Sequence, residues 1–214
     1  MSQAGQAVGD RLNALLAESG LEPLNAGESA RFADYLSLLL RWNARVNLTA
    51  IRDEEGILKR HFVESIACAR ALPAGIARLL DFGSGAGFPG LPIALCRPEI
   101  GVTLAESQGK KAAFLSEAIR VLGVGARVHS GRAETLGLQF DCVTLRAVDK
   151  MELAVRASSR LVRPGGWLAL MITLAEMNRL KNAAGQEFSW LQSVPFPGGE
   201  DRILALAVHS AEIV

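Results

Sequence analysis

The sequence contains no apolar run long enough to cross a membrane. A membrane-spanning helix needs about 18 or more consecutive apolar residues, and none of the 214 residues lies in such a segment. The first ten residues also lack the basic and apolar regions of a secretory signal. We therefore expect a cytoplasmic protein with no membrane partner.

Cysteine and histidine are scarce as well. Cys68, Cys96 and Cys142 lie far apart and form no CxxC pair, a pattern typical of reduced thiols in a reducing compartment. The three histidines are not at metal-ligand spacing. We therefore expect neither disulfide bonds nor a metal site.

The chain also lacks a surplus of charge of one sign. It has 23 Lys and Arg residues against 22 Asp and Glu residues, a net charge of +1. Such a balance argues against a protein that coats nucleic acid non-specifically, so any basic surface must be local. A hydrophobic content of 50% excludes a disordered chain. A length of 214 residues predicts one domain with a helical extension.

Residues 1–73 are predicted to form a helical extension packed on the rest of the chain. Leu12, Leu15 and Leu16 lie on one face of a first helix, and residues 32–40 show helical spacing in a second. A third helix is expected from a cap at Asp53 until Pro73.

Residues 74–214 alternate between strands and helices, which predicts an α/β domain with a mostly parallel sheet. The expected strands are Leu79–Phe82, Val102–Ala105, Arg127–His129, Asp141–Leu145 and Trp167–Met171. The expected helices are Leu91–Cys96, Lys110–Leu122 and Met151–Leu161. The last two strands, Phe188–Val194 and Ile203–Val208, are joined by too few residues for a crossover helix, so we expect a C-terminal antiparallel hairpin.

A glycine-rich loop, DFGSGAGFPG at residues 81–90, leaves the first expected strand and enters a helix. Glycines at such a turn allow the backbone to approach a nucleotide-like ligand, although a tight strand–helix turn uses the same residues. Asp81 precedes the first glycine, where its carboxylate could reach a ligand's amino group. Glu106 ends the next strand, 23 residues after Gly83, the spacing of a carboxylate that binds ribose hydroxyls.

The chain resembles the bacterial ribosomal small-subunit methyltransferase G family, also called glucose-inhibited division protein B, from about Leu36 to Val208. The motifs that carry the resemblance are RWN at 41–43 with NLT at 47–49, RHF at 60–62, GSGAGFPG at 83–90, ES at 106–107 with KK at 110–111, GRAE at 131–134 and RA at 146–147. The resemblance implies a Rossmann-like class I methyltransferase fold. It also implies transfer of a methyl group from S-adenosyl-L-methionine to N7 of one guanine in 16S ribosomal RNA. The expected partner is therefore 16S ribosomal RNA, within the 30S subunit or an assembly intermediate.

The resemblance also implies which residues contact the cofactor. They are Gly83, Ser84, Gly85, Gly87 and Phe88 in the loop, Glu106 at the ribose, Ala133 and Glu134 beside the adenine, and Arg146 near the methionine moiety and the target base. Guanine N7 carries an available lone pair, so catalysis needs no acid or base and can rest on positioning, here by Arg146.

Local basic clusters at 41–60 and 146–163 suggest where RNA phosphates bind. We expect RNA contacts at Arg60, His61, Lys110, Arg132 and Arg202, although a solvated helix face has the same composition. His61 is also compatible with a packing role.

Three positions differ from the family pattern. Glu64 stands where members carry Asp, and Ile172-Thr173 replaces a usual Lys-Gly. The missing Lys keeps open a non-catalytic, cofactor-binding ribosome-assembly protein. The glycine loop and Glu106 would also suit a nicotinamide-dependent oxidoreductase, which the final hairpin and the lack of a plausible proton donor disfavour.

Overall fold

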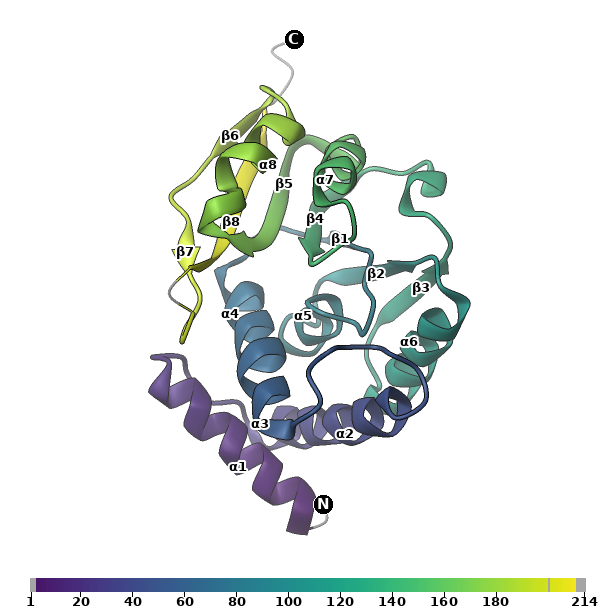
Figure 1. The fold of residues 1–214 in the computed structure, drawn as a ribbon, viewed down its shortest axis with the longest axis vertical. Helices are drawn as coiled ribbons and strands as arrows, with labels where there is room; N and C mark the ends of the chain where they lie inside the picture. The colour runs from purple at the N-terminus through teal and green to yellow at the C-terminus, as the bar shows by residue number, and fades with distance from the viewer. Residues whose placement is uncertain (1–2, 200, 211–214) are drawn as a thin grey trace.

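A central sheet lies between two layers of helices in the computed structural model, which describes residues 3–199 and 201–210 (Figure 1). Within these residues the sheet has eight strands in the order β3-β2-β1-β4-β5-β8-β6, and β7 pairs with β8. The strands are β1 Arg78–Phe82, β2 Gly101–Glu106, β3 Ala126–Ser130, β4 Phe140–Arg146, β5 Val162–Thr173, β6 Phe188–Trp190, β7 Val194–Pro195 and β8 Arg202–His209.

Strands β1 to β5 are parallel, and β8 runs antiparallel to β5, β6 and β7. The parallel sheet and the antiparallel end are therefore confirmed. The hairpin is less regular than predicted, because residues 191–193 separate β6 from β7 and β8 inserts between β5 and β6. Strand order reverses between β1 and β4, and such a switch point opens a crevice at the carboxyl ends of the strands.

The three predicted N-terminal helices are present, but the third changes its winding. The helical elements are α1 Gln3–Glu18, α2 Ala26–Asn43, α3 Glu54–Ile57, the π-helical turn η1 Leu58–Val63, α4 Glu64–Ala71, α5 Gly90–Cys96, α6 Gly109–Leu122, η2 Ala133–Leu136, α7 Met151–Ser159, η3 Leu174–Glu176 and α8 Met177–Ala184. Asp53 caps α3 through a hydrogen bond from the Gly56 N–H to its carboxylate. Among the described residues, no helix is both long and apolar enough to span a bilayer.

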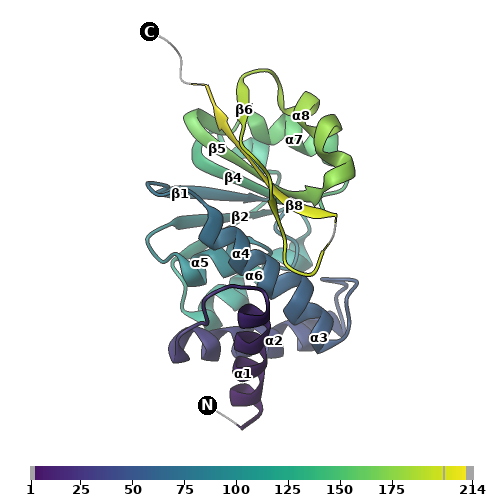
Figure 2. The ribbon, with the colours of Figure 1, turned by 90° about the vertical axis from the view of Figure 1, so that its left-hand side faces the viewer.

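Helices α4, α5 and α6 lie on one face of the sheet, with α2 packed outside α5 and α6 and α1 packed outside α2, and α7 and α8 lie on the other face (Figure 2). The first face shares one apolar cluster with the extension, because Phe32 and Tyr35 of α2 belong to the same cluster as Leu79 of β1 and Phe114 of α6. Trp42 packs edge-on against Phe114 and donates a hydrogen bond to Glu117. Residues 3–73 are thus joined to the body through a continuous core.

Two further stretches differ from the sequence-based expectation. Helix α8 was not predicted, because it is short and only Met177, Leu180 and the 183–184 pair mark its apolar face. Strand β5 begins at Val162 rather than Trp167, with a shift in register opposite Phe140 and Cys142.

Candidate cofactor and substrate pockets

The glycine loop between β1 and α5 is anchored to the end of β2. The backbone N–H groups of Gly83 and Ser84 both donate to the Ala105 carbonyl, at 3.0 Å each. The Gly87 N–H donates back to the Ser84 carbonyl at 2.6 Å and closes a tight turn. The loop therefore lies over the carboxyl ends of β1 and β2, where a parallel sheet of this kind binds ligands.

Gly85 is the residue of this loop that leaves space for a ligand. Its φ is +55°, which favours glycine, and a Cβ added there would meet only the Gly83 carbonyl, at 3.9 Å. Its N–H donates to Glu106 Oε2 at 2.9 Å, while the Gln108 N–H donates to Oε1 at 2.7 Å. Glu106 therefore holds the loop with the carboxylate that is expected to bind ribose.

A first pocket, here called the cofactor pocket, opens beside this loop. It brings together Gly83, Glu106, Ala133 and Glu134 of the expected cofactor contacts. Its other lining residues are Phe82, Ala105, Ser107, Gly131, Arg132, Val148, Asp149, Lys150, Leu153 and Ala154. The pocket combines an apolar wall, which suits a purine ring, with acidic groups, which suit ribose hydroxyls, so its lining fits an adenosine.

The segment after β4 was not predicted to form the opposite wall of the cofactor pocket. Ala147 and Lys150 adopt φ of 49° and 50°, values that non-glycine residues seldom take. Backbone of this kind often occurs at functional sites. In the sequence, the position of residues 147–150 directly after the strand that ends at Arg146 is the feature that could have identified this wall.

Three of the expected cofactor contacts, Ser84, Gly87 and Phe88, do not line the cofactor pocket. The Ser84 hydroxyl donates inward to the Asp81 carbonyl, and Phe88 is buried in an aromatic cluster. At Gly87 a Cβ would lie 2.5 Å from Leu91 Cδ1, so this glycine is required by packing. These residues shape the loop from behind.

Asp81 lies in a different place from the one expected. Its carboxylate is buried and accepts hydrogen bonds from the Gly90 N–H at 3.2 Å and from Thr144 Oγ1 at 2.9 Å. Burial raises the pKa of Asp81 to about 6. The side chain joins β1, β4 and the start of α5 instead of reaching a ligand.

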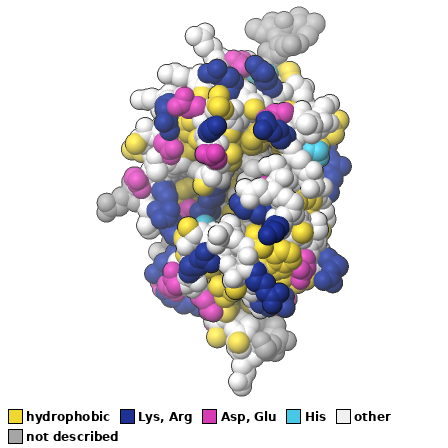
Figure 3. Space-filling view, turned by 45° about the vertical axis from the view of Figure 1, so that its right-hand side comes forward, with side chains coloured by type: hydrophobic (Ala, Val, Ile, Leu, Met, Phe, Trp, Pro, Cys, Tyr) yellow, Lys and Arg dark blue, Asp and Glu magenta, His cyan; other side chains and the backbone are white. Residues whose placement is uncertain are grey.

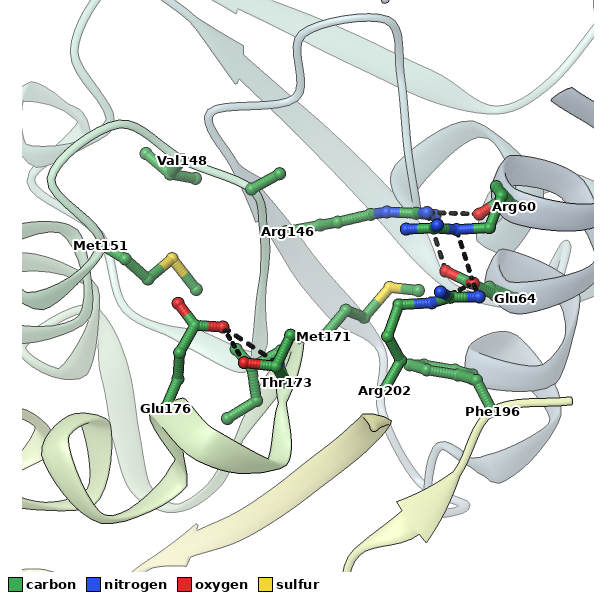
Figure 4. Close-up of a pocket in the computed structure, with 12 residues that line it drawn as sticks. Arg60, Glu64, Arg146, Val148, Met151, Met171, Thr173, Glu176, Phe196 and Arg202 are labelled. Carbon is green, nitrogen blue, oxygen red and sulfur yellow. Dashed lines mark hydrogen bonds and ion pairs between the residues drawn. The ribbon is translucent and has the colours of Figure 1, made fainter. Parts of the chain in front are cut away.

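A second pocket, here called the arginine pocket, lies beside the first (Figure 4). Figure 4 shows three guanidinium groups, from Arg60, Arg146 and Arg202, converging on the carboxylate of Glu64. The other lining residues are Ala147, Val148, Met151, Met171, Ile172, Thr173, Glu176 and Phe196. Three cations thus face two carboxylates in a partly apolar pocket.

Glu64 joins three parts of the chain at this pocket. Its side chain is 2% exposed and accepts from Arg146 Nη2 at 2.8 Å and from Arg202 Nε and Nη2 at 2.7 Å each. Arg60 Nε lies 3.3 Å from the same carboxylate. Arg146 also donates to the Arg60 carbonyl and to Ser65 Oγ. Arg146, with 11% of its side chain exposed, is therefore a largely buried cation fixed in place, and burial lowers its pKa while Glu64 opposes that shift.

The two residues that replace the family's Lys-Gly both line the arginine pocket. Ile172 belongs to the apolar cluster beneath α7 and α8. Thr173 pairs with Arg202 across the β5–β8 ladder, and its hydroxyl donates to Glu176 at 2.8 Å in a capping box that starts η3. In this chain these positions serve packing and helix capping.

The residues expected to contact RNA do not all lie at one site. Arg60 and Arg202 meet at the arginine pocket, Arg132 lines the cofactor pocket, and Lys110 is exposed near the start of α6. His61 stacks on Phe88 with ring centroids 4.6 Å apart, and its Nε2 is 2.7 Å from Thr49 Oγ1. Burial, then Arg146 and Arg60, lower the pKa of His61 to about 3, so the ring is neutral at physiological pH.

The two pockets adjoin, since Val148 lines both. Figure 3 shows Lys and Arg side chains around a hollow on one face of the molecule. A molecule bound in the cofactor pocket would therefore lie next to the arginine pocket. Glu64 and Val148 were missed as site residues by sequence reasoning.

Comparisons with known proteins agree with this geometry. A family model described as rRNA small subunit methyltransferase G matches residues 28–204. The ribosomal RNA small subunit methyltransferase G of Roseiflexus sp. (strain RS-1) is 40% identical over 202 residues, covering 88% of this chain and 86% of that protein. The protein of the same name from Stenotrophomonas maltophilia (strain K279a) is 45% identical over 159 residues, covering 73% of each chain.

Solved structures support the fold. A putative O-methyltransferase from Klebsiella pneumoniae superimposes with a TM-score of 0.58 at 18% identity, over 97% of this chain and 99% of that one. P. horikoshii TYW2 in complex with MeSAdo gives a TM-score of 0.57 at 16% identity, over 71% of this chain and 63% of that one. The fold is therefore that of a class I methyltransferase, and the chain belongs to the rRNA small subunit methyltransferase G family.

Proposed function

We propose that this chain transfers the methyl group of S-adenosylmethionine to N7 of a guanine in 16S ribosomal RNA, with the 30S subunit or an assembly intermediate as its substrate particle. The observation that carries the proposal is the contact between the cofactor pocket and the arginine pocket at Val148. Family membership supports the same reaction and argues against the oxidoreductase alternative.

The cofactor pocket fits S-adenosylmethionine. Gly85 leaves open space beside the loop, and Glu106 offers a carboxylate at the edge of the pocket for ribose hydroxyls. Ala133 and Glu134 form the wall expected beside the adenine. When bound, the cofactor would supply a methyl carbon on a sulfonium: the N7 lone pair would form the new nitrogen–carbon bond while the carbon–sulfur electron pair returns to sulfur, leaving a neutral thioether and a positively charged guanine, with no proton to remove.

The work left to the protein is positioning. Arg146 is held by Glu64, by Ser65 and by the Arg60 carbonyl, so its guanidinium is fixed before substrate binds. A fixed donor suits the guanine O6 or a neighbouring phosphate and aligns N7 with the cofactor. Val148, Met151 and Met171 line the pocket with apolar side chains, which would limit access of water to the reacting atoms.

The target guanine must be accessible outside a regular helix. N7 lies in the major groove, which is deep and narrow in A-form RNA and closed to side chains. A pocket recessed between β4, β5 and α4 needs a base that is unpaired or turned out of its stack. The arginine pocket has room for such a base and cations for the phosphates around it.

The test is transfer of labelled methyl from S-adenosylmethionine to 30S subunits that lack the modification, followed by identification of the modified nucleoside. We expect N7-methylguanosine in 16S RNA. Cofactor binding without incorporation would contradict the proposal and favour the non-catalytic assembly protein.

A second experiment examines the substrate particle. From a net charge of +1 we expect little general affinity for RNA, so that the shape of the particle contributes to recognition. We expect faster methylation of 30S subunits than of protein-free 16S RNA. Equal rates on the two substrates would contradict this part of the proposal.

Arg146→Ala tests the positioning role. We expect transfer to fall by about 1–3 kcal/mol in transition-state stabilisation, the scale of a charge-assisted contact, with a smaller change in cofactor affinity. Equal losses in binding and transfer would instead make Arg146 a cofactor ligand.

A further inference from the structure

One side chain of the helical extension reaches the glycine loop directly. Tyr35, the only tyrosine of the chain, lies on α2 and is fully buried. Its hydroxyl donates a hydrogen bond of 2.5 Å to the carbonyl of Ala86, in the middle of the loop. The two residues are 51 positions apart in the sequence.

This contact is the extension's only hydrogen bond to the loop among the described residues. The other hydrogen bonds of the loop come from the body, through Ala105, Glu106, Asp81 and the loop's own backbone. Within the described part of the chain, the Ala86 carbonyl accepts from no other donor. If the Tyr35 hydroxyl is removed, this carbonyl has no replacement partner in the protein.

The ring that carries the hydroxyl is fixed on both sides. Tyr35 stacks on Phe62 at 5.2 Å with an interplanar angle of 23°, and on Phe88 of the loop at 5.3 Å with an angle of 26°. The hydroxyl also lies where a Cβ on Gly87 would come within 2.8 Å of it. Burial and the nearby Asp81 carboxylate raise the pKa of Tyr35, so the hydroxyl remains protonated and able to donate.

We propose that Tyr35 is a positioning residue for the methyl donor, acting through the Ala86 carbonyl to hold the glycine loop in its ligand-accepting shape. The inference rests on the proposed cofactor role of that loop. Gly85, whose N–H faces Glu106, immediately precedes Ala86, so a shift of the Ala86 carbonyl changes the peptide next to the open side of the loop. The extension thus contributes to cofactor binding as well as covering the sheet.

Tyr35→Phe tests this role because it removes the hydroxyl and keeps the stacked ring. Loss of one buried hydrogen bond predicts that the Kd for S-adenosylmethionine and its KM rise about 3- to 10-fold. We expect kcat at saturating cofactor to stay near the wild-type value, because the reacting atoms are aligned by other residues once the loop is occupied. Isothermal titration calorimetry gives Kd, and methyl transfer to 30S subunits gives KM and kcat.

Phe32→Leu is the matched control. Phe32 is buried in the same aromatic cluster, with its ring 5.2 Å from Phe62, but it makes no hydrogen bond to the loop. We expect this variant to lower the melting temperature at least as much as Tyr35→Phe and to leave the cofactor Kd unchanged. The comparison separates a specific effect on the loop from a general loss of stability.

Two results would overturn the inference. One is an unchanged cofactor Kd in Tyr35→Phe, which would make the hydroxyl merely structural. The other is an equal rise in Kd in both variants, which would trace the effect to stability. Wild-type protein that binds no S-adenosylmethionine would overturn the proposed function itself, a distinguishable result because it needs no variant.

Discussion

Glu64 is a single carboxylate that holds three arginines at the place where substrate is expected to bind. Because the Glu64 carboxylate is buried, little solvent screens its attraction to Arg146 and Arg202. Glu64→Gln keeps the shape and removes the charge, and breaking a buried ion pair in this way destabilises proteins by about 3–5 kcal/mol. We expect lower stability in urea unfolding and a larger loss of methyl transfer than of cofactor affinity.

Glu64→Asp is the control for that prediction, since it keeps the charge on a shorter side chain. We expect it to retain more stability and more activity than Glu64→Gln. A Gln variant as active as the wild type would show that the carboxylate does not position the arginines.

His61 gives the protein an acid-sensitive residue away from any catalytic step. Its pKa is lowered to about 3 in the folded state, against about 6.5 in an unfolded chain. Between these values the unfolded state binds more protons, so stability contributed by neutral His61 falls as pH drops from about 6.5 towards 3. Asp81, with its pKa raised to about 6, has the opposite effect on stability between pH 4 and 6. The effect of His61 is therefore measured as the difference in stability between the wild type and a His61 variant.

His61→Gln supplies that difference. We expect it to be less stable than the wild type at pH 7.5 and to lose less stability on acidification, so that the gap narrows by pH 5. Chemical denaturation at several pH values measures it. A gap that stays constant with pH would mean that His61 does not titrate between the two states as proposed.

The contacts made by Glu64 and Tyr35 show what the sequence could not predict at this scale. The sequence identifies Glu64 only as a departure from Asp, and Tyr35 only as part of an apolar helix face. Their partners, Arg202 and Ala86, are 138 and 51 residues away. No local pattern records such pairs, because they depend on how separate elements pack.

At the scale of elements, the glycine loop makes a prediction that a second glycine can control. Gly85 at φ +55° and Gly123 at φ +59° have the same left-handed backbone, and neither has a neighbour within 3.5 Å of an added Cβ. Replacing either by Ala therefore costs similar stability, on the order of 1 kcal/mol. We expect only Gly85→Ala to weaken binding of S-adenosylmethionine, by at least tenfold, because its methyl group would enter the cofactor's space.

Calorimetric titration of both variants measures this, with thermal unfolding as the check on stability. Equal cofactor affinity in Gly85→Ala and Gly123→Ala would contradict the assignment of the loop.

The central parallel strands were predictable because buried strands are short apolar runs between turn signals, whereas β3 (sequence ARVHS) is only partly buried. The π-helical turn η1 and helix α8 were not, since a change of winding leaves no distinct pattern and α8 has only eight residues. The insertion of β8 between β5 and β6 was also unpredictable, because strand order depends on contacts beyond the neighbouring turn.

At the scale of the whole molecule, the net charge of +1 means that the position of each cation matters more than the total. Arg60 lies at the arginine pocket, near the carboxyl ends of the strands. Arg78 is exposed at the start of β1, at the amino ends of the parallel strands. Replacing either by Gln lowers the net charge equally. If RNA binds over the pockets, only Arg60→Gln removes a phosphate contact.

We therefore expect Arg60→Gln to weaken RNA binding and to reduce the slope of log affinity against log salt by about one, while Arg78→Gln leaves both unchanged. Filter binding of 30S subunits across a salt series measures the slope, and cofactor titration checks that the neighbouring pocket is intact. Equal changes in the two variants would mean that RNA responds to total charge, and would remove the arginine pocket from its path. A change confined to Arg60 would place the RNA backbone where a guanine can enter beside the methyl donor.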